Sequence, residues 1–276
     1  MAGTLYLVPT PIGNLGDLSD RMRRTLTEAD FIAAEDTRVT RKLLSHLGLH
    51  KPMVSYHEHN KRISGQQIVQ RILQGETCAL VTDAGTPAIS DPGEDLVRLC
   101  AEAGVPVCAV CGPCAAVTAL AVSGLPTGRF TFEGFLSTNK KSRQEHLTSL
   151  TAETRTMIFY EAPHKLLPTL EDLRRAFGGD RRISLCRELT KLHEEILRIT
   201  LDEAVARYAE TPPRGEYVLV VAGAEEKADD EMTLAEAVAL VTERIADGIS
   251  KKDAVRQVAS ETGFPKNELY AAVMKA

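Results

Sequence analysis

Short apolar runs alternate with amphipathic segments along the first part of the chain. The apolar runs cover residues 5–8, 31–34, 78–82 and 105–110, and each has the length and composition of a buried strand. Between them apolar residues recur at helical spacing, as at Ile63, Ile68 and Ile72. This alternation predicts an α/β fold with a mostly parallel, doubly wound sheet in a first domain, residues 1–122.

The apolar runs change character in the second part of the chain. They cover residues 130–135, 155–160, 182–187, 195–200 and 217–222. Because only a short polar stretch separates the third run from the fourth, we expect some antiparallel pairing there. We predict a second α/β domain with a mixed sheet at residues 123–224. The polar, charged segment that follows suggests a solvated linker at residues 225–232.

The C-terminal segment, residues 233–276, has the signals of a small helical domain. Two pairs of residues have the spacing of a helix capping box: Thr233 with Glu236, and Ser250 with Asp253. Gly263 stands where a helix should stop. We predict three short helices, the last two spaced as in a helix-turn-helix. A plain helical cap on the second domain is the alternative.

An uncharged run from residue 103 to residue 128 is long enough to suggest a membrane helix. Pro106, Gly112 and Pro113 interrupt it, so we expect a strand, a tight turn and a buried helix at residues 114–122, with no membrane span. The N-terminus MAGTLYLV has no basic region and indicates a first strand instead of a secretory signal. We therefore expect a cytoplasmic protein.

Charge and cysteine content narrow the function classes. A net charge of −5 and a pI near 5.9 argue against a wholesale nucleic-acid coat, although a local basic face remains compatible with them. Cys108, Cys111 and Cys114 have a spacing that also occurs in metal sites. Strand alternation would point the first two to opposite faces, so we interpret them as small buried residues. His57 and His59 belong to a polar loop on the same reasoning, and we predict no metal.

Four loops leave predicted strand ends with unusual residues. They are PTPIGNLGD (9–17), AEDTR (34–38), DAGTPAISDPG (83–93) and CGPCAA (111–116). Ligands of open α/β sheets bind at this edge. The chain has no glycine-rich dinucleotide fingerprint and no P-loop, which disfavours a phosphate-rich ligand. Acidic loops with close-approach glycines suit a small cation such as S-adenosylmethionine, although ordinary tight turns use the same residues.

Several long motifs resemble a known family. They are VPTPIGNLGDLSDR (8–21), AAEDTRVTRKLL (33–44), YHEHN (56–60), VTDAGTPAISDPG (81–93) and FYEAPHK (159–165). In this order they resemble the tetrapyrrole methylase superfamily, and within it the members that modify small-subunit ribosomal RNA. The resemblance covers essentially the whole chain. It implies two α/β domains with S-adenosylmethionine in the cleft between them, a homodimer, and 2′-O-methylation of a cytidine in the decoding region of 16S rRNA.

The resemblance also implies a set of cofactor-binding residues. They are Pro11, Asp83, Gly85, Thr86, Ile89, Gly112, Pro113, Ala115, Ala116, Tyr160, Glu161 and Leu189. The chain departs from the family pattern at two positions, with Cys114 in place of serine and Lys165 in place of arginine. Cys114 lacks the hydroxyl of serine, which is a good hydrogen-bond donor, and Lys165 lacks the planar guanidinium of arginine.

Catalysis on a ribose hydroxyl needs a group that orients the oxygen and takes its proton. Spacing alone leaves several candidates, because each of them follows a predicted strand end: Glu35, Asp36, Glu161, Glu188 and Lys191. We choose Asp36, with Glu35, Glu188 and Lys191 as alternatives. A cap of the following helix, which we expect to start near Thr40, would explain Asp36 equally well.

RNA contacts are predicted at exposed cations. Lys140, Lys141 and Arg143 cluster in a stretch that we interpret as a polar loop, and Arg38 follows the acidic pair of AEDTR. Two rival functions remain open. A methylase of a tetrapyrrole precursor would use the same cofactor, but its carboxylate-rich substrate suits arginines better than AEDTR. A nucleic-acid-binding protein without chemistry would use the C-terminal helices, whose excess of positive charge is small.

Overall fold

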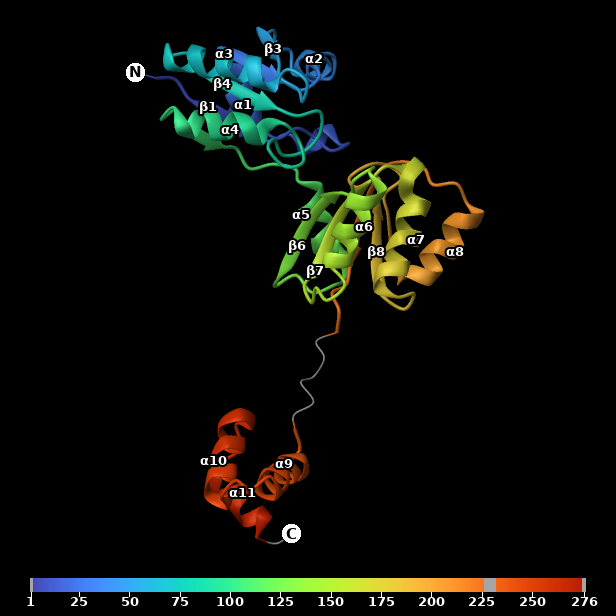
Figure 1. Cartoon of the computed structure of the whole chain (residues 1–276). Helices are drawn as coiled ribbons and strands as arrows, with labels where there is room; N and C mark the ends of the chain where they lie inside the picture. Colours follow the sequence, from blue (N-terminus) through green and yellow to red (C-terminus); the bar gives the residue numbers. More distant parts are fainter. Residues whose placement is uncertain (1, 226–231, 275–276) are drawn as a thin grey trace. The chain divides into compact units, whose positions relative to one another are not determined.

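The structure is a computed structural model that describes residues 2–225 and 232–274. The chain separates into two compact units, Met1–Ala224 and Glu225–Ala276. The first unit contains two β-sheets with their helices, and the described part of the second contains helices only (Figure 1). The linker predicted at 225–232 falls mostly on residues 226–231, which lie outside the described residues.

The first sheet is entirely parallel and has the strand order β3-β2-β4-β1-β5. Its strands are β1 (Leu5–Leu7), β2 (Phe31–Ala34), β3 (Met53–Ser55), β4 (Cys78–Val81) and β5 (Val107–Ala109). Successive connections run first toward one edge and then toward the other, which places helices on both faces. The predicted doubly wound parallel sheet is therefore confirmed.

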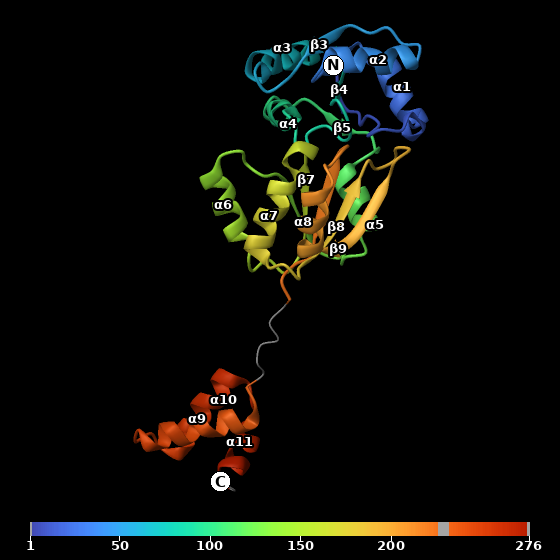
Figure 2. The ribbon, with the colours of Figure 1, turned by 90° about the vertical axis from the view of Figure 1, so that its right-hand side faces the viewer.

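Each face of the first sheet is covered by a pair of helices (Figure 2). The helices are α1 (Asp20–Glu28), α2 (Thr37–His46), α3 (Lys61–Leu73) and α4 (Gly93–Glu102), with the short 3-10 helix η1 (Leu15–Asp17) before α1. Met22 and Leu44 belong to the core under α1 and α2, and Ile68 and Leu96 to the core under α3 and α4. The apolar spacing in the sequence thus corresponds to the buried helix faces.

Two strands of this sheet differ from the prediction. We did not predict β3, because Met53 and Val54 form too short an apolar run for a pattern to emerge. β5 is shorter than the predicted strand, and it lies at the sheet edge with Ala109 exposed. Only the flanking residues Val105 and Val110 are buried. An edge strand has a neighbouring strand on one side only, so it is less buried than its apolar residues led us to predict.

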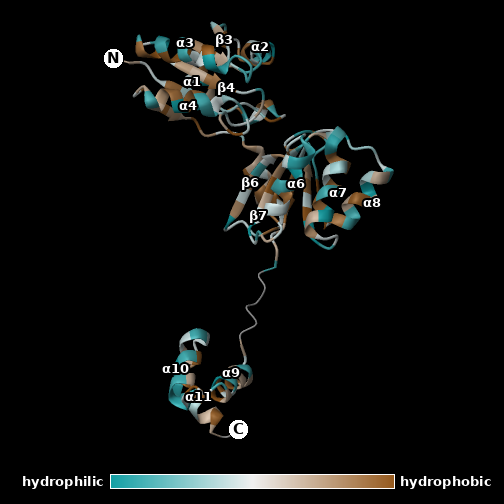
Figure 3. Ribbon diagram, in the orientation of Figure 1, coloured by the Kyte–Doolittle hydropathy of each residue, from teal (hydrophilic) through white to brown (hydrophobic). Residues whose placement is uncertain are grey.

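The second sheet is mixed, as predicted, and has the strand order β6-β7-β10-β8-β9. Its strands are β6 (Phe130–Phe135), β7 (Thr156–Glu161), β8 (Arg182–Arg187), β9 (Glu195–Thr200) and β10 (Tyr217–Val221). Only the pair β6–β7 is parallel, and the other neighbours are antiparallel. The strands of both sheets are largely hydrophobic (Figure 3).

Helices cover both faces of the second sheet as well. One core contains residues of α6 (Lys140–Ser149), α7 (Leu166–Phe177) and α8 (Leu201–Glu210), with the 3-10 helix η2 (Pro163–Lys165) before α7. The opposite face packs against α5 (Ala115–Ser123), whose Ala119 and Leu120 contact the cluster of Ile158 and Val220. The predicted domain boundary at residue 122 is therefore too late, because α5 belongs by packing to the second sheet.

Three helices form the core of the second unit. They are α9 (Leu234–Ala246), α10 (Lys251–Thr262) and α11 (Lys266–Val273). Thr233 and Glu236 form the predicted capping box, and Ser250 accepts the N–H of Asp253. Gly263 ends α10 in the left-handed conformation, with φ +76°. The apolar sides of all three helices pack into one core.

The uncharged run at residues 103–128 is divided between β5, a turn and α5. Among the described helices, none has both the length and the apolar character that crossing a membrane requires.

Candidate active site

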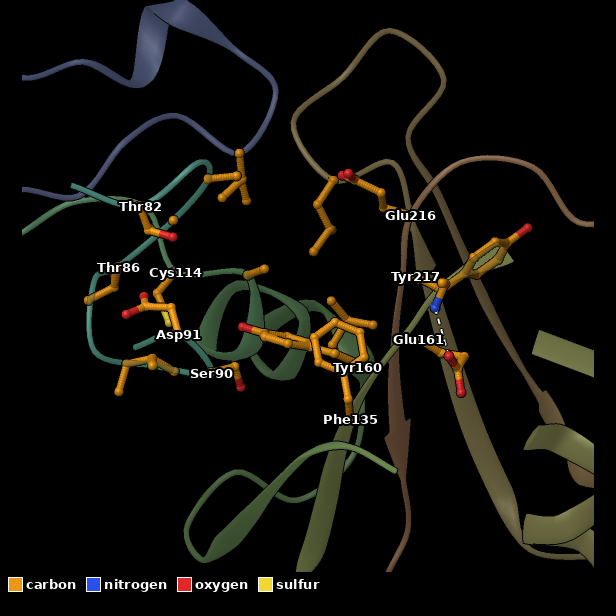
Figure 4. A pocket seen from close by; sticks show the side chains of 18 of the residues that line it. Thr82, Thr86, Ser90, Asp91, Cys114, Phe135, Tyr160, Glu161, Glu216 and Tyr217 are labelled. Carbon is orange, nitrogen blue, oxygen red and sulfur yellow. Dashed lines mark hydrogen bonds between the residues drawn. The ribbon is translucent and has the colours of Figure 1, made fainter. Parts of the chain in front are cut away.

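A cavity of about 530 Å³ opens between the loops of the first sheet and the strands of the second. Ligand pockets in proteins commonly have volumes of roughly 300–1,000 Å³. The first wall consists of loop residues, among them Ile12, Glu35, Thr82, Gly85, Thr86, Ile89, Ser90, Asp91, Cys114 and Ala115. The second wall includes Phe135, Tyr160, Glu161, His164, Cys186, Leu189, Glu216, Tyr217 and Val218 (Figure 4).

The loop after β4 builds most of the first wall, and its own side chains hold its shape. Gly85 pairs with Thr10 in an isolated antiparallel bridge and has a φ of +89°, a conformation that favours glycine. Thr86 Oγ1 donates to the carbonyl oxygen of Pro113 at 2.8 Å, which joins this loop to the one before α5. Asp91 Oδ1 accepts two backbone N–H groups of its own loop, at 2.9 and 2.7 Å. These hydrogen bonds within and between the loops therefore hold the loop in shape.

Four described residues other than glycine have a positive φ, and all of them flank an aliphatic residue of the pocket. Ala88 and Ser90, with φ of 69° and 62°, flank Ile89 in the first wall. The neighbours of Leu189 in the second wall have φ of 51° and 66°. Such conformations cost about 1–3 kcal/mol each and persist only where the surroundings enforce them. The strain in this chain is concentrated where two apolar side chains face the cavity.

Four carboxyl groups gather at the carboxyl edge of the first sheet: Glu35, Asp36, Asp83 and Asp91. Glu35 lines the cavity and accepts the hydroxyl of Thr82 at 2.8 Å. Burial raises the pKa of Asp91, and the nearby charge of Glu35 raises it further. Burial likewise raises the pKa of Asp83, whose Oδ1 accepts the backbone N–H of Asp36. This edge of the pocket is therefore strongly acidic.

Asp36 is engaged differently. Its side chain is the N-cap of α2 and accepts the backbone N–H of Arg38 at 2.7 Å. The Arg38 guanidinium also binds it, and this hydrogen bonding lowers the pKa of Asp36 to about 2. Asp36 is not among the residues that line the cavity. The helix starts at Thr37, earlier than the predicted Thr40, so the capping alternative describes Asp36 correctly and the geometry disfavours it as the base.

The other two catalytic candidates form an ion-pair network beside the pocket. Lys191 Nζ lies 2.8 Å from an oxygen of Glu188 and 2.9 Å from one of Glu216. Partial burial by itself lowers the pKa of Lys191, but the hydrogen bonds to both carboxylates outweigh it and the net pKa is raised. Neither Lys191 nor Glu188 lines the cavity, whereas Glu216 does. A lysine held in its charged form is a poor proton acceptor.

The cofactor residues implied by the resemblance lie in or next to the cavity. Those that line it are Gly85, Thr86, Ile89, Ala115, Tyr160, Glu161 and Leu189. Those that do not line it are Pro11, Asp83, Gly112, Pro113 and Ala116. Two of the latter support the lining residues directly: Pro113 accepts the hydroxyl of Thr86, and Ala116 donates its N–H to Tyr160 Oη at 3.1 Å. Burial raises the pKa of Tyr160 to about 12.

The predicted RNA-binding cations have unequal surroundings. Lys140 and Lys141 are exposed, but they begin α6, so the prediction of a loop is wrong. Asn139 caps this helix, which explains why a polar stretch is helical here. The Arg143 side chain is only 15% exposed and pairs with Asp172 at 2.6 Å, so a structural role explains it. Arg38 is 84% exposed despite its bond to Asp36.

Several pocket residues escaped the sequence analysis. Phe135, Cys186 and Val218 lie on strands of the second sheet, where nothing in the sequence marks which apolar side chains face a cavity. Asp91 stands in the acidic loop that we predicted to suit a cationic ligand, but it was not among the predicted cofactor residues. Cys114 occupies the N-cap of α5 and makes no side-chain capping bond, in keeping with its departure from serine.

Within residues 2–225 and 232–274, no three histidine, cysteine or acidic side chains are grouped closely enough to hold a metal ion. The three cysteines of the C-x-x-C-x-x-C spacing lie on β5, in the following turn and at the start of α5. Cys111 is exposed, and Cys108 and Cys114 are half-buried, so the interpretation as buried residues is wrong.

Comparisons with known proteins agree with this geometry. Residues 4–205 match the family model of the Tetrapyrrole (Corrin/Porphyrin) Methylases. A ribosomal RNA small subunit methyltransferase I of Halalkalibacterium halodurans is 49% identical, over 97% of this chain and 93% of its own length. The protein of that name from Synechocystis sp. is 47% identical, over 97% and 96% respectively.

A solved structure shares the fold at low sequence identity. It is a uroporphyrin-III C-methyltransferase from Thermus thermophilus complexed with S-adenyl homocysteine, with a TM-score of 0.57 and 18% identity, covering 80% of this chain and 97% of that one. The family match and the full-length relatives lead to one conclusion: the chain belongs to the tetrapyrrole (corrin/porphyrin) methylase family, in the group of the ribosomal RNA small subunit methyltransferase I proteins.

Proposed function

We propose that this protein transfers a methyl group from S-adenosylmethionine to the ribose 2′-oxygen of a cytidine in the decoding region of 16S rRNA. Its relatives at 47% and 49% identity carry the name of a small-subunit rRNA methyltransferase and match almost all of the chain. We infer the cytidine as the modified nucleotide, and the 2′-oxygen as the methylated atom, from the resemblance of the motifs. A cytoplasmic homodimer is part of the same proposal, on the same resemblance.

The charge of the pocket carries this function. Glu35 and Asp91 bring carboxyl groups to its walls, Glu216 does so while paired with Lys191, and in the described part of the chain no lysine or arginine lines it. Coulomb attraction in a partly desolvated cavity favours a ligand with a positive centre, such as a sulfonium. The same field repels the many carboxylates of a tetrapyrrole precursor, so this pocket disfavours the rival methylase.

The start of α5 offers a place for the carboxylate of the methyl donor. The first N–H groups of a helix have no partner within the helix, and the helix dipole favours an anion there. Cys114 leaves this end without a side-chain cap, and Ala115 lines the cavity. The residues present thus match both ends of S-adenosylmethionine, the sulfonium and the carboxylate.

Glu35 is our proposed base, in place of Asp36. S-adenosylmethionine supplies an electrophilic methyl group when bound. Glu35 lines the cavity, and the Thr82 hydroxyl donates a hydrogen bond to its Oε2, which leaves Oε1 for the substrate. Glu35 can therefore accept the 2′-hydroxyl proton as the new carbon–oxygen bond forms and the methyl–sulfur bond breaks. Asp36 is a weaker base because Arg38 holds its pKa near 2.

Exposed cations near the pocket edge suit a phosphate backbone. Arg38, Arg41 and Lys42 lie on exposed positions of α2, the helix that begins beside Glu35. Lys140 and Lys141 occupy the first turn of α6, where the helix dipole disfavours positive charge. Cations in such a place gain from a bound anion, which supports the prediction of phosphate contacts there.

The decisive experiment combines the purified protein, radiolabelled S-adenosylmethionine and small ribosomal subunits from a strain that lacks its gene. We expect label in 16S rRNA and, after digestion, 2′-O-methylcytidine identified by mass spectrometry. Free 16S rRNA and a carboxylate-rich tetrapyrrole serve as parallel substrates. Label in the tetrapyrrole, or label in RNA on a base instead of a ribose, would refute the proposed function.

A further inference from the structure

An irregularity in the edge strand β6 determines which side chains face the pocket. Phe132 pairs with Ile158 and Phe135 with Tyr160 in the neighbouring strand β7, and the register shifts between Phe132 and Gly134. A regular strand alternates its side chains, so residues three apart would point to opposite faces. The one-residue bulge, with Gly134 at φ +62°, puts both phenylalanines on the same face.

Both rings contact Tyr160. The Phe132 and Phe135 ring centroids lie 5.1 and 5.5 Å from that of Tyr160, with interplanar angles of 72° and 62°. Such edge-to-face pairs are favourable and hold the rings in place. Tyr160 is in turn fixed by the N–H of Ala116 in the first turn of α5. The bulge therefore places Phe135 in a rigid aromatic group next to the proposed site of the methyl donor.

Phe135 nevertheless remains 58% exposed, although it lines the cavity. Figure 4 shows its ring beside that of Tyr160 at the pocket. A fully buried phenylalanine would gain about 1.5–3 kcal/mol over an exposed one, so the sequence forgoes part of that stabilisation here. The bulge turns this exposed ring toward the pocket, where a ligand can cover it.

We propose that Phe135 stacks on the nucleobase of the acceptor nucleotide and so positions its ribose at the methyl donor. This inference rests on the proposed function and names the residue that receives the substrate. An enzyme that modifies one nucleotide takes it out of the helical stack, and unstacked bases bind to aromatic side chains. Among the phenylalanine and tyrosine side chains that line the pocket, that of Phe135 is the most exposed.

The test uses three variants of the full-length protein. Phe135→Leu keeps an apolar side chain of similar size but removes the π-face, and Phe135→Trp enlarges it. Phe130→Leu is the matched control, because Phe130 is 42% exposed on the same strand and does not line the cavity. For each protein we would measure methyl transfer to small subunits from the gene-deletion strain, S-adenosylmethionine affinity by calorimetry, and oligomeric state by sedimentation velocity.

Stacking on one base is worth about 1–3 kcal/mol, which corresponds to roughly 5- to 150-fold in kcat/KM. We expect a loss in this range for Phe135→Leu, largely in KM for the subunit, with donor affinity unchanged. Phe135→Trp keeps a stacking surface and should be less impaired than Phe135→Leu, whereas Phe130→Leu should resemble the wild type.

Three results would overturn the stacking role. Loss of donor affinity in Phe135→Leu would assign the ring to the cofactor, and a changed oligomeric state would assign it to a second copy of the chain. Equal defects in Phe135→Leu and Phe130→Leu would point to a general effect of the strand. Failure of the proposed function itself would appear separately, as absence of transfer by the wild type.

Discussion

The two walls of the pocket are built on different principles. Loops form the first wall, and it presents backbone groups and the carboxylates of Glu35 and Asp91. Strands contribute much of the second wall, which presents Phe135, Tyr160 and Val218 from the face of a sheet. Loop-borne carboxylates in one wall thus face a largely apolar strand surface in the other. We infer that the first wall handles the reacting groups and the second positions flat or apolar parts of the ligands.

The largest effect should come from the carboxylate of the first wall. Glu35→Gln keeps the size and the bond to Thr82 but removes the base, so single-turnover methyl transfer should fall about 100-fold or more. Donor affinity should change little. Asp36→Asn is the matched control and should keep most of its activity, since Asn also caps helices well. A larger defect in Asp36→Asn would return the base to Asp36.

Backbone conformation is the next test of the first wall. A Cβ at Gly85 would meet only Ile12 and Pro113, no closer than 3.5 Å, so space alone does not forbid a side chain. The φ of +89° does disfavour valine, and Gly85→Val should weaken S-adenosylmethionine binding about 10-fold or more while the protein stays folded. Gly104→Val, at φ +67° in open space, controls for strain elsewhere. Calorimetry with equal donor affinity in both variants would contradict the assignment.

A smaller effect is expected where the two walls touch. Tyr160→Phe removes the oxygen that accepts the N–H of Ala116 but keeps the ring against Phe132 and Phe135. Loss of one such bond costs about 0.5–1.5 kcal/mol, or roughly 2- to 13-fold in donor affinity. Normal affinity would show that water replaces the hydroxyl and that the bond does not organise the pocket.

A gain is expected at the helix end between the walls. Cys114 is the N-cap of α5 in extended backbone conformation and makes no side-chain capping bond. Cys114→Ser should supply that bond and stabilise the protein by about 0.5–1 kcal/mol, which chemical denaturation can measure. Destabilisation would mean that the thiol packs better than the hydroxyl caps.

The smallest effect concerns the pH dependence of Asp36. Its pKa is about 2 in the folded protein against an ordinary value of 3.8, because it bonds to Arg38. A lowered folded pKa stabilises the native state above pH 3.8, and this contribution is lost as the pH falls toward 2. The stability difference between the wild type and Asp36→Asn should therefore shrink over that range. A difference that stays constant with pH would mean that the charge of Asp36 does not contribute to it.

The two walls also differ in how far the sequence predicts them. Asp83, Gly85 and Pro87 form a local pattern, because a tight turn needs those residue types in that order, and the edge of a parallel sheet gathers such turns. The choice between Glu35 and Asp36 was beyond the sequence, since it depends on which side chain reaches Arg38 or Thr82. In both sheets, the apolar runs located the core strands correctly.

The second wall depends on contacts between distant segments. We did not predict the bulge at Gly134, because only the pairing with β7 shows that the register shifts and that Phe135 turns toward the pocket. The sequence also could not tell which of the two sheets α5 covers. An uncharged helix such as Ala115–Ser123 has no polar side that would orient it.

The position of α5 has a mechanical consequence. The chain passes from the first sheet to the second through residues 111–114, and within residues 2–225 it does not return to the first sheet. In this linking segment the carbonyl oxygen of Pro113 accepts the hydrogen bond of the Thr86 hydroxyl, and Cys114 lines the cavity. A ligand bound there would contact the segment that links the two sheets and also both walls of the cavity. Binding should accordingly slow hydrogen exchange along α5 and raise the unfolding temperature of both sheets together.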